Sequence, residues 1–532
     1  MPPLVDPRPL RWLIAAPLSA SPSGRRITVS GERFTTVMGS FSPAATVSVP
    51  DRVGSDDTRS LAMEFGRPRD FRVRDVMGKV ELLGSLSAIV DRLAKDGDTA
   101  RALQQIRTAI GDGRWVDMIE GRPPTPPVIR AAASTSTQPP AAATDGDDDD
   151  DPIFGKAALA PEPERTAAEA KSAVGSFISA MRSGDSPVPA PTSGRECGKL
   201  LRASLQETAG DFLAAAPVAR LESAWRSLRM IMAACPSADD LGVDALDTEP
   251  SAMLQALAPA LDADAWDRPD AVFVAEPVGD PELLGALADL ADAARVPIVV
   301  QVRHETVGLA PDAQDVTEEI PEAWTALRDR ASAGWLCAVV GAPVVFHEDD
   351  GGPRTVFGGG AAAIAAMAAT SVGGTGTPAG ILGKNGALVA PAAHDVKQPG
   401  GSHTIPTEHF LAYRTQQALG SRGVTALGSE SDSDRLRLAG APMVGGDMAL
   451  PGRILAGRAH RLAVAVRQQL GPGATQSELE RALDEASGAF LPKVGSQAVN
   501  LRVRGMDKDG AQVDASIGAA LAGSSVSFSS DV

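Results

Sequence analysis

The sequence has few cysteines. Only three occur in 532 residues, Cys197, Cys235 and Cys337, and they are widely spaced. Neither a disulfide framework nor a CxxC metal site can be built from them. Cys337 lies inside an apolar segment, where a thiol normally behaves as a small buried hydrophobe. This cysteine usage fits a reducing compartment, and we expect a cytoplasmic protein.

Long apolar runs are also missing. The longest nearly apolar run, 361–372, is far shorter than the ~20 residues of a membrane-crossing helix. Near the N-terminus, Arg8 and Arg11 precede the apolar residues 12–18, which loosely resembles a signal peptide. Asp6 and several prolines do not fit the first region of a signal peptide. We therefore predict a short edge strand at 12–18 and no membrane insertion.

Basic residues are outnumbered. The chain has 50 Lys and Arg against 67 Asp and Glu, a formal net charge of -17. A protein this acidic lacks the cationic surface that nucleic acids and anionic membranes require. We expect no nucleic-acid partner, and any partner held by charge should be basic.

Motifs for nucleotide binding and nucleophilic catalysis are absent. The Gly-rich segment 373–386 is the natural candidate for a phosphate loop, but Pro378 stands where the first glycine is required. Asn385 follows Lys384 where Ser or Thr is required. No GxGxxG opens a helix after a predicted strand, and no GxSxG occurs. We predict no cofactor.

Metal-ligand motifs are incomplete. His304-Glu305 and His347-Glu348 each begin a string like HExxH, but Gly308 and Gly351 replace the second histidine. We therefore predict no metal ligands. With no convergent set of titratable groups, we also predict no catalytic residues and a protein that is not an enzyme.

One segment divides the chain. Residues 122–164 are rich in Pro, Ala and Asp and almost free of large apolar residues, so they cannot bury enough surface to offset their ordering entropy. The Asp run 147–151 lacks the glycine and final glutamate of an EF-hand loop. We predict domains at 1–121 and 165–532, joined by a disordered linker at 122–164.

The first half shows strand and helix patterns. Alternating apolar residues predict strands near 26–34, 45–53 and 61–65, and helical spacing predicts a helix over 75–93. We expect a small α+β unit.

The second half is dominated by an α/β pattern. Residues 196–234 are strongly helical, and 271–302 reads strand, helix, strand, with Asp280 as N-cap and Pro281 at the first helical position. Near-continuous apolar strands imply a covered parallel sheet. Further elements are expected as follows: strands at 335–346 and 386–391, a covering helix at 361–372, helices at 451–470 and 477–490, and a hairpin at 499–517 turning at 507–510.

Residues 10–110 resemble the small subunit of the type VI secretion sheath. The resemblance runs through RITVSGERFTTVMGSFSPAATVSVPDRV at 26–53 and FGRPRDFRVRDVMGKVELLGSLSAIVDRL at 65–93. The matching positions are Phe34, Met38, Pro43, Val49, Pro50, Phe65, Asp70, Phe71, Leu82 and Leu83.

Most of residues 195–532 resemble the large subunit of the same sheath. The matching segments are ARLESAWRSLRMIM at 219–232, the strand-helix-strand segment 270–302, EAWTALRDRASAGWLCAVVGAPVVF at 322–346, GALVAP at 386–391 and LPGRILAGRAHRLAVAVRQQLG at 450–471. The last includes Leu450, Pro451, Arg458, Ala459, His460, Arg461 and Leu462. The Gly-rich 440–449 segment is compressed relative to the family, and this half is short for a large subunit.

The resemblance implies a contractile-tail-sheath-like fold and a structural role. The chain would be a fused sheath protomer that polymerises around an inner tube and contracts to propel it, by relaxation of a metastable lattice. Its implied partners are copies of itself, an inner-tube hexamer protein and a baseplate. A non-contractile sheath relative that docks on a baseplate, or a nucleotide-binding scaffold module, are the alternatives.

The resemblance also assigns interfaces. Extended arms of the family add strands to neighbouring protomers, a form of β-augmentation, and the arms here would be 10–18 and 524–532. Within them we select Trp12, Leu13, Ile14, Val526 and Phe528 as inter-protomer strand residues.

The family's large subunit carries an N-terminal helix that an AAA+ recycling unfoldase reads. The corresponding segment is 165–181, and its apolar stripe consists of Ala173, Val174, Phe177, Ile178 and Met181. Packing of this stripe on its own domain is an equally good interpretation.

The helix at 477–490 corresponds to the family helix that lines the lumen. We expect Ser477 as its N-cap and a buried stripe of Leu479, Leu483 and Ala486. Its tube-facing residues would be Glu478, Glu480, Asp484 and Glu485. The alternative is a solvated acidic face.

Overall fold

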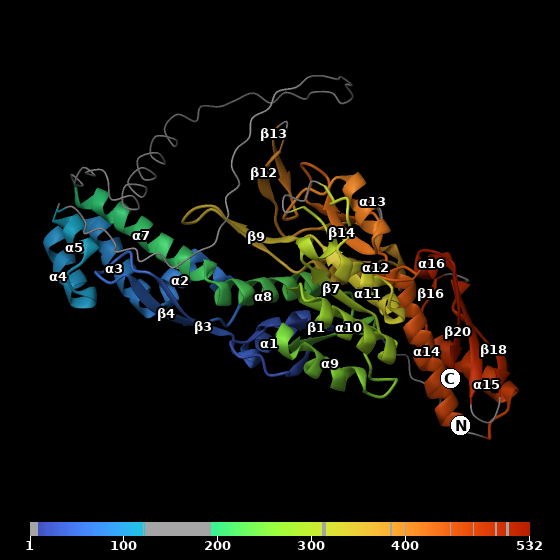
Figure 1. Ribbon diagram of the computed structural model, residues 1–532. Coiled ribbons are helices and arrows are strands. Elements are labelled where there is room, and N and C mark those ends of the chain that lie inside the picture. The colour runs from blue at the N-terminus through green and yellow to red at the C-terminus, as the bar shows by residue number, and fades with distance from the viewer. Residues whose placement is uncertain are drawn as a thin grey trace, which may run out of the picture. The chain divides into compact units, whose positions relative to one another are not determined.

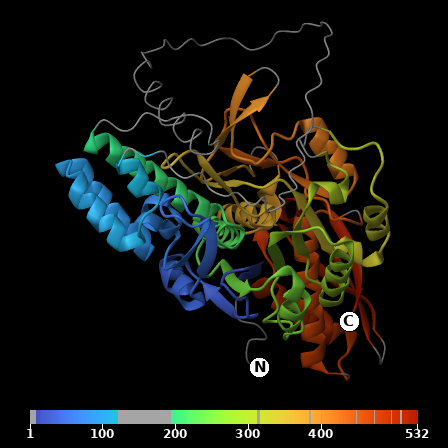
Figure 2. The ribbon, with the colours of Figure 1, turned by 60° about the vertical axis from the view of Figure 1, so that its left-hand side comes forward.

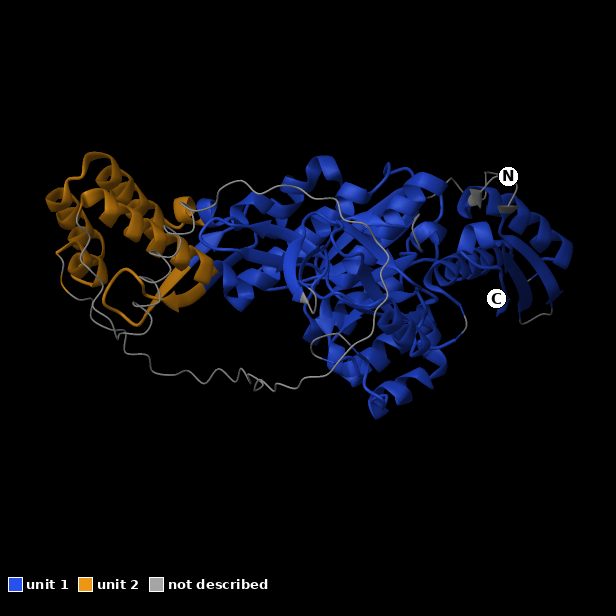
Figure 3. Ribbon diagram, turned by 90° about the horizontal axis from the view of Figure 1, so that it is seen from above, with its two compact units in different colours: residues 1–46, 62–75, 213–532 blue, residues 47–61, 76–212 orange. Residues whose placement is uncertain are grey.

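The computed structural model describes residues 9–120, 122, 193–310, 315–382, 386–398, 401–446, 448–471, 473–494, 497–506 and 510–532 (Figure 1). The chain has a mixed α/β fold, as predicted. It divides into two compact units, coloured separately in Figure 3. Unit 1 comprises Met1–Thr46, Ala62–Asp75 and Leu213–Val532, and unit 2 comprises Val47–Leu61 and Val76–Phe212. These units do not follow the predicted domain boundaries at 121 and 165.

Unit 1 is built on a large sheet. Among the described residues it has nine strands in the order β11, β15, β14, β8, β7, β6, β1, β5 and β2. The strands are β1 (Leu10–Ala16), β2 (Arg26–Val29), β5 (Leu241–Asp247), β6 (Ala271–Val278), β7 (Ile298–Val302), β8 (Leu336–Val340), β11 (Leu388–Val389), β14 (Val424–Ser429) and β15 (Arg435–Leu438). The strands from β14 to β5 pair in parallel, and antiparallel strands flank them.

Helices cover both faces of this sheet, which explains why its central strands are apolar on both faces. One face packs on α9 (Met253–Leu261), α10 (Pro281–Ala294), α11 (Glu322–Arg328) and α13 (Tyr413–Ser421). The other packs on α12 (Gly360–Thr375) and α8 (Ala216–Ala234). The predicted strand-helix-strand segment is confirmed, and Asp280 caps α10 with its side chain. The predicted helix at 361–372 is α12, and its residues are almost all buried.

The predicted strand at 335–346 is divided. β8 ends at Val340, and β9 (Val344–Glu348) pairs instead with β10 (Arg354–Phe357). Gly341 lies between them with φ 89°. A Cβ at this position would lie 3.0 Å from the carbonyl oxygen of Leu427, so both the turn and the close approach of the backbone favour glycine. A second hairpin pairs β12 (His394–Gln398) with β13 (Gly401–Ile405).

The C-terminal part of unit 1 has a core of its own. Apolar residues of α14 (Leu450–Leu470), α15 (Gln476–Phe490) and a three-stranded antiparallel sheet pack together, and these elements lie side by side in Figures 1 and 2. The sheet orders its strands β18 (Asn500–Met506), β19 (Ala511–Ile517) and β20 (Val526–Asp531). The short elements here are β16 (Lys493–Val494), β17 (Gln497–Ala498) and α16 (Ala519–Ala522). The predicted helices and hairpin are confirmed; residues 507–509 of its turn lie outside the described residues.

Unit 2 is mainly helical. It contains α3 (Glu81–Asp96), α4 (Thr99–Ile110), α5 (Arg114–Ile119) and most of α7 (Gly194–Ala214). The helix predicted over 75–93 is interrupted at Val80, which separates α2 (Val73–Lys79) from α3. The strands predicted near 45–53 and 61–65 are β3 (Ala44–Pro50) and β4 (Thr58–Glu64), which pair with each other and each include residues of both units. The strand predicted near 26–34 is shorter than expected, because β2 ends at Val29 and residues 31–33 form a 3₁₀ turn. In unit 1, α1 (Phe34–Phe41) follows β2.

Candidate functional site

The N-terminal strand β1 lies in the centre of the large sheet. It pairs in parallel with β5 on one edge and with β6 on the other. Trp12, Leu13 and Ile14 are at most 2% exposed, and the Trp12 ring packs edge-on against Phe273 at 5.3 Å. The predicted edge strand is therefore wrong: an almost entirely apolar strand is typical of a sheet covered on both faces.

This position also corrects an interface prediction. Trp12, Leu13 and Ile14 were expected to pair with a neighbouring protomer. Both edges of β1 carry hydrogen bonds to strands of the same chain, so this strand has no free edge to offer. Its role is to complete the sheet of unit 1.

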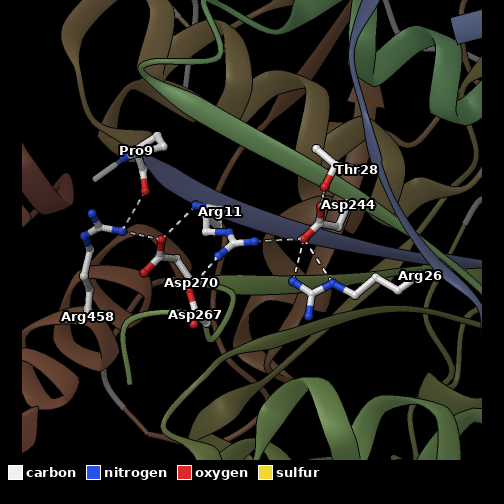
Figure 4. A network of polar contacts seen from close by, with 8 residues as sticks. All are labelled: Pro9, Arg11, Arg26, Thr28, Asp244, Asp267, Asp270 and Arg458. Atoms are coloured by element: carbon white, nitrogen blue, oxygen red, sulfur yellow. Dashed lines mark hydrogen bonds and ion pairs between the residues drawn. The ribbon is translucent and has the colours of Figure 1, made fainter. Parts of the chain in front are cut away.

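A buried charge cluster fixes the start of β1. Asp270, immediately before β6, accepts a hydrogen bond from the backbone N–H of Arg11 at 2.8 Å, as Figure 4 shows. The carboxylate also contacts the guanidinium groups of Arg458 and Arg461 on α14. All three charged side chains are at most 3% exposed. Burial lowers the pKa of Arg461 to about 10, so it stays protonated at neutral pH.

Asp244 on β5 forms the second half of this network. It accepts hydrogen bonds from Arg26 Nε at 3.0 Å and from the Thr28 hydroxyl at 2.6 Å, both on β2, and contacts Arg11 at 3.4 Å (Figure 4). Burial alone would raise the pKa of Asp244, but the hydrogen bonds from Thr28 and Arg26 and the nearby positive charges lower it below its usual value. The ion pairs thus join β1, β2 and β5.

Helix α14 extends the network to the C-terminal core. The Arg458 guanidinium stacks over the Phe490 ring at 4.0 Å and donates to the Phe490 carbonyl oxygen at 2.6 Å, which ties α14 to the end of α15. Arg461 donates to the carbonyl oxygen of Arg295 at 2.9 Å. His460 shares a hydrogen bond with Ser530 on β20. Burial lowers the pKa of His460 to about 4, and nearby arginines act in the same direction.

Segment 219–232, which also carries the large-subunit resemblance, contributes to a second buried charge cluster. Glu222 on α8 is fully buried and pairs with Arg226 one turn later and with Arg354 on β10. The Arg226 guanidinium lies 3.6 Å from the centre of the Phe346 ring. Arg354 also contacts Glu348 at 2.6 Å. In this site each arginine has a carboxylate partner, which offsets the cost of burying its charge.

Trp225 of the same motif binds the N-terminal segment. Its Nε1–H donates to the Leu18 carbonyl oxygen at 3.0 Å, and its ring packs edge-on against Phe34 and Phe41 of α1. Phe34 is among the residues that carry the small-subunit resemblance. Residues of the two resembling portions therefore form one core in unit 1.

In unit 2 a helix from the second portion of the chain packs with elements of the first portion. Arg52 donates to Asp211 at 2.7 Å and pairs with Glu207 at 2.9 Å, both on α7. The buried Trp115 of α5 donates its indole N–H to Ser204 of α7, whose hydroxyl in turn donates to the Arg52 carbonyl oxygen. Helix α7, from the portion after the predicted linker, thus packs among helices from the portion before it.

The predicted tube-facing residues lie on one exposed helix. Glu478, Glu480, Asp484 and Glu485 are exposed on α15, whereas Leu479, Leu483 and Ala486 are buried, as expected. The N-cap is Thr475 rather than Ser477, because the Thr475 hydroxyl accepts from the Glu478 N–H while the Glu478 carboxylate accepts from the Thr475 N–H. The Glu478 carboxylate therefore already caps the start of its own helix.

The C-terminal strand has one edge without a partner in the described part of the chain. β20 pairs with β19 only, and Val526 and Phe528 are half-buried against the C-terminal core. Their assignment as inter-protomer residues stays a prediction. The predicted unfoldase-binding residues Ala173, Val174, Phe177, Ile178 and Met181 lie outside the described residues, as does the predicted linker apart from Arg122.

The Gly-rich segment is used for a helix end. α12 ends at Thr375 with Gly376 as its C-cap, and the hydroxyls of Ser371 and Thr375 donate to the carbonyl oxygen of Thr377. Residues 383–385, which include Lys384, are not among those described. No helix in the described residues combines the length and the apolar character that a membrane span requires.

One polar cluster was missed at the level of sequence. His304 lies close to Glu408 and His409, about 100 residues later in the chain, and both histidines are half-buried. His347, by contrast, lies on β9 and bonds to the Thr355 hydroxyl. Spacing motifs detect ligands on one element, so a cluster formed by two distant segments leaves no such signal.

No family model and no curated protein matches the chain. Among solved structures, it is similar to a chain of the anti-feeding prophage (AFP) baseplate, with 14% identity, coverage of 58% of this chain and 76% of that chain, and a TM-score of 0.34. It is similar to a chain of the contracted AFP helical sheath, with 16% identity, coverage of 57% and 77%, and a TM-score of 0.34. The third similarity is to the contracted PVC sheath complex of an extracellular contractile injection system, with 12% identity, coverage of 60% and 80%, and a TM-score of 0.33.

Proposed function

We propose that this chain is a structural protomer of a contractile sheath, in which portions resembling the small and large subunits of the type VI secretion sheath are joined in one polypeptide. One observation carries the proposal: the two portions build each other's cores. β1 inserts between β5 and β6 in unit 1. In unit 2, α7 contacts α5 through the Trp115–Ser204 hydrogen bond and α3 through the ion pair of Arg202 with Asp91. Two separate subunits with this exchange would be obligate partners, and a fusion keeps them in equal number.

The partners that follow from this proposal are copies of the chain, an inner-tube hexamer, a baseplate and an AAA+ unfoldase, in the cytoplasm. Contacts between copies would use the open edge of β20. An unpaired strand edge is a ready template for another strand, and here it would serve assembly. The exposed acidic face of α15 is suited to a basic tube surface.

Electron microscopy and sedimentation of the purified full-length chain, alone and with the inner-tube protein, test the proposal. We expect helical tubules that pellet at moderate speed. A chain that stays monomeric with the tube protein present would contradict the sheath assignment. Discs or rings would favour the non-contractile relative, and a rise in melting temperature with nucleotide would favour the scaffold module.

The geometry of β20 gives a sharper variant. Val532 and Ala511 exchange both backbone hydrogen bonds, so Val526, Phe528 and Ser530 also bond to β19 and Ser527 points its N–H away from it. Ser527→Pro should remove an outward donor without breaking the bonds to β19. We expect a folded chain that forms no tubules, whereas Ser527→Ala should assemble normally. Tubules from the proline variant would exclude this edge from assembly.

A further inference from the structure

Two histidines and a glutamate converge in unit 1. One potential ligand atom from each of His304, Glu408 and His409 lies within 4.8 Å of the other two. The two imidazole rings are 5.3 Å apart between centroids, and His409 Nε2 lies 3.7 Å from Glu408 Oε1. Side chains from segments a hundred residues apart therefore point to one place.

The cluster lies at the carboxyl ends of two neighbouring parallel strands. His304 begins the 3₁₀ turn η4 (His304–Val307), which follows β7 directly. Glu408 donates its backbone N–H to the Ala342 carbonyl oxygen at 2.8 Å, just beyond the end of β8. β7 and β8 pair in parallel. Open α/β sheets bind their ligands at this end of the strands, so the location is one that favours a site.

The backbone around Glu408 and His409 is held in place. The Thr407 hydroxyl donates to the His409 carbonyl oxygen at 2.9 Å, and His394 Nε2–H donates to the Thr407 carbonyl oxygen at 2.9 Å. Thr407 also forms an isolated antiparallel β-bridge with Pro343. Because these bonds fix the main chain, Glu408 and His409 need only side-chain rotation to bring their ligand atoms together.

The donor set suits a borderline divalent metal ion. In the described residues neither ring nitrogen of His304 takes part in a hydrogen bond. The His409 ring pairs with Glu408 and lies beside the His304 ring. Two imidazoles with one carboxylate are a known ligand set for Zn²⁺, with metal-ligand distances of about 2.0–2.2 Å. Tetrahedral geometry at these lengths places ligand atoms roughly 3.4 Å apart. The ligand atoms of this cluster lie within 4.8 Å of one another, so they would have to approach by little more than about 1 Å to bind the ion.

We propose that His304, Glu408 and His409 form a binding site for one divalent transition-metal ion of the Zn²⁺ class. The ion would join the turn after β7 to the segment after β13. Neither the ligand set nor the location depends on the proposed sheath function.

Calorimetric titration of the tag-free, EDTA-treated full-length chain with Zn²⁺ tests the site. We expect one ion per chain and a higher melting temperature for unit 1. His304→Ala and His409→Ala should each weaken binding at least about 100-fold, since the loss of a ligand should exceed the 10–100-fold effect of losing its supporting hydrogen bond. Co²⁺ in place of Zn²⁺ should give the strong visible absorption of a four-coordinate site.

The matched control is His403→Ala, because His403 is a half-exposed histidine that pairs with Asp432 and does not belong to the cluster. It should bind Zn²⁺ like the unchanged chain. Glu408→Gln keeps the shape of a half-exposed side chain, so it should fold and still bind Zn²⁺ more weakly. Absence of saturable binding below about 100 μM, a range far weaker than structural zinc sites, would overturn the proposal. Binding that all three ligand variants retain would do the same.

Discussion

Both compact units combine residues from before and after segment 123–192, but the ion pairs that join these residues differ in burial. In unit 1 the junction is a central strand, β1, with the fully buried charges Asp270, Arg458 and Arg461 at its start. In unit 2 it is a helix, α7, whose ion pairs to Arg52 are 16–29% exposed at their side chains. Water screens the second set and is excluded from the first.

The difference predicts how each junction responds to change. A buried ion cluster costs several kcal/mol to desolvate and stabilises the fold only while every charge has its partner. A partly exposed ion pair contributes little to stability, and water replaces a lost partner at low cost. We therefore expect unit 1 to depend steeply on single residues and on pH, and unit 2 to lose stability gradually.

The largest effect should come from Asp270→Ala. This change leaves Arg458 and Arg461 buried without a carboxylate, and removal of one partner from a buried pair costs about 3–5 kcal/mol. Hydrogen exchange monitored by mass spectrometry should show the loss of protection in β1, β6 and α14 of unit 1, with unit 2 unchanged. A loss below about 1 kcal/mol would mean that the cluster contributes no more than an exposed pair.

The pH dependence should be the next largest effect. The pKa of His460 is lowered to about 4 in the folded chain from 6.5, so between these values the unfolded chain binds a proton that the folded chain does not. Stability should therefore fall as the pH is lowered through this window, by about 1 kcal/mol between pH 7 and pH 5.5.

Urea unfolding of unit 1 at the two pH values measures this slope. His460→Asn keeps a polar atom near the position of Nδ1 but does not titrate, so it should lack this part of the slope. Unit 2 provides the contrast: hydrogen bonds from Arg59 and from backbone N–H groups outweigh the burial of Asp51 and lower its pKa below 3.8, so its contribution persists to more acidic pH. If the unchanged chain and the His460→Asn variant show the same dependence of stability on pH, His460 is not its source.

A smaller effect is expected from Arg52→Ala in unit 2. It removes the ion pairs to Asp211 and Glu207, which remain hydrated, so the expected loss is about 1 kcal/mol or less. The same exchange measurement on α7 reports it. A loss as large as that of Asp270→Ala would break the distinction between the two junctions.

The smallest effect on stability should come from reversing charge on α15. Glu480, Asp484 and Glu485 are exposed, so their triple replacement by Lys should change the unfolding free energy by less than about 0.5 kcal/mol per site. Glu478 is left in place because it completes the capping box. If the acidic face binds the inner tube, co-sedimentation with the tube protein should be lost.

The control for this reversal is the triple replacement of the exposed Glu318, Glu319 and Glu322 by Lys, which changes the net charge equally. It should leave co-sedimentation intact. If both triple variants lose the tube, overall acidity rather than the face of α15 is responsible. If neither does, the solvated-face interpretation of α15 holds.

Local pattern was enough to predict most elements of this chain. The apolar runs at 271–276 and 297–302 became β6 and β7, Asp280 and Pro281 began α10, and the apolar spacing in 450–470 became α14. These features depend on neighbours within about four residues, because capping and amphipathic spacing act over one helical turn or two strand residues. The sequence by itself therefore determined the class of the fold and the helices and strands that compose it.

Only the tertiary structure decided which distant residues meet. Asp270 and Arg458 are 188 residues apart, β1 and β5 are separated by more than 220 residues, and His304 meets His409 across two intervening hairpins. Strand order depends on which surfaces are buried together, and periodicity within one segment carries no information about its partner. The central place of β1, the division into units and the histidine cluster therefore follow from long-range packing alone.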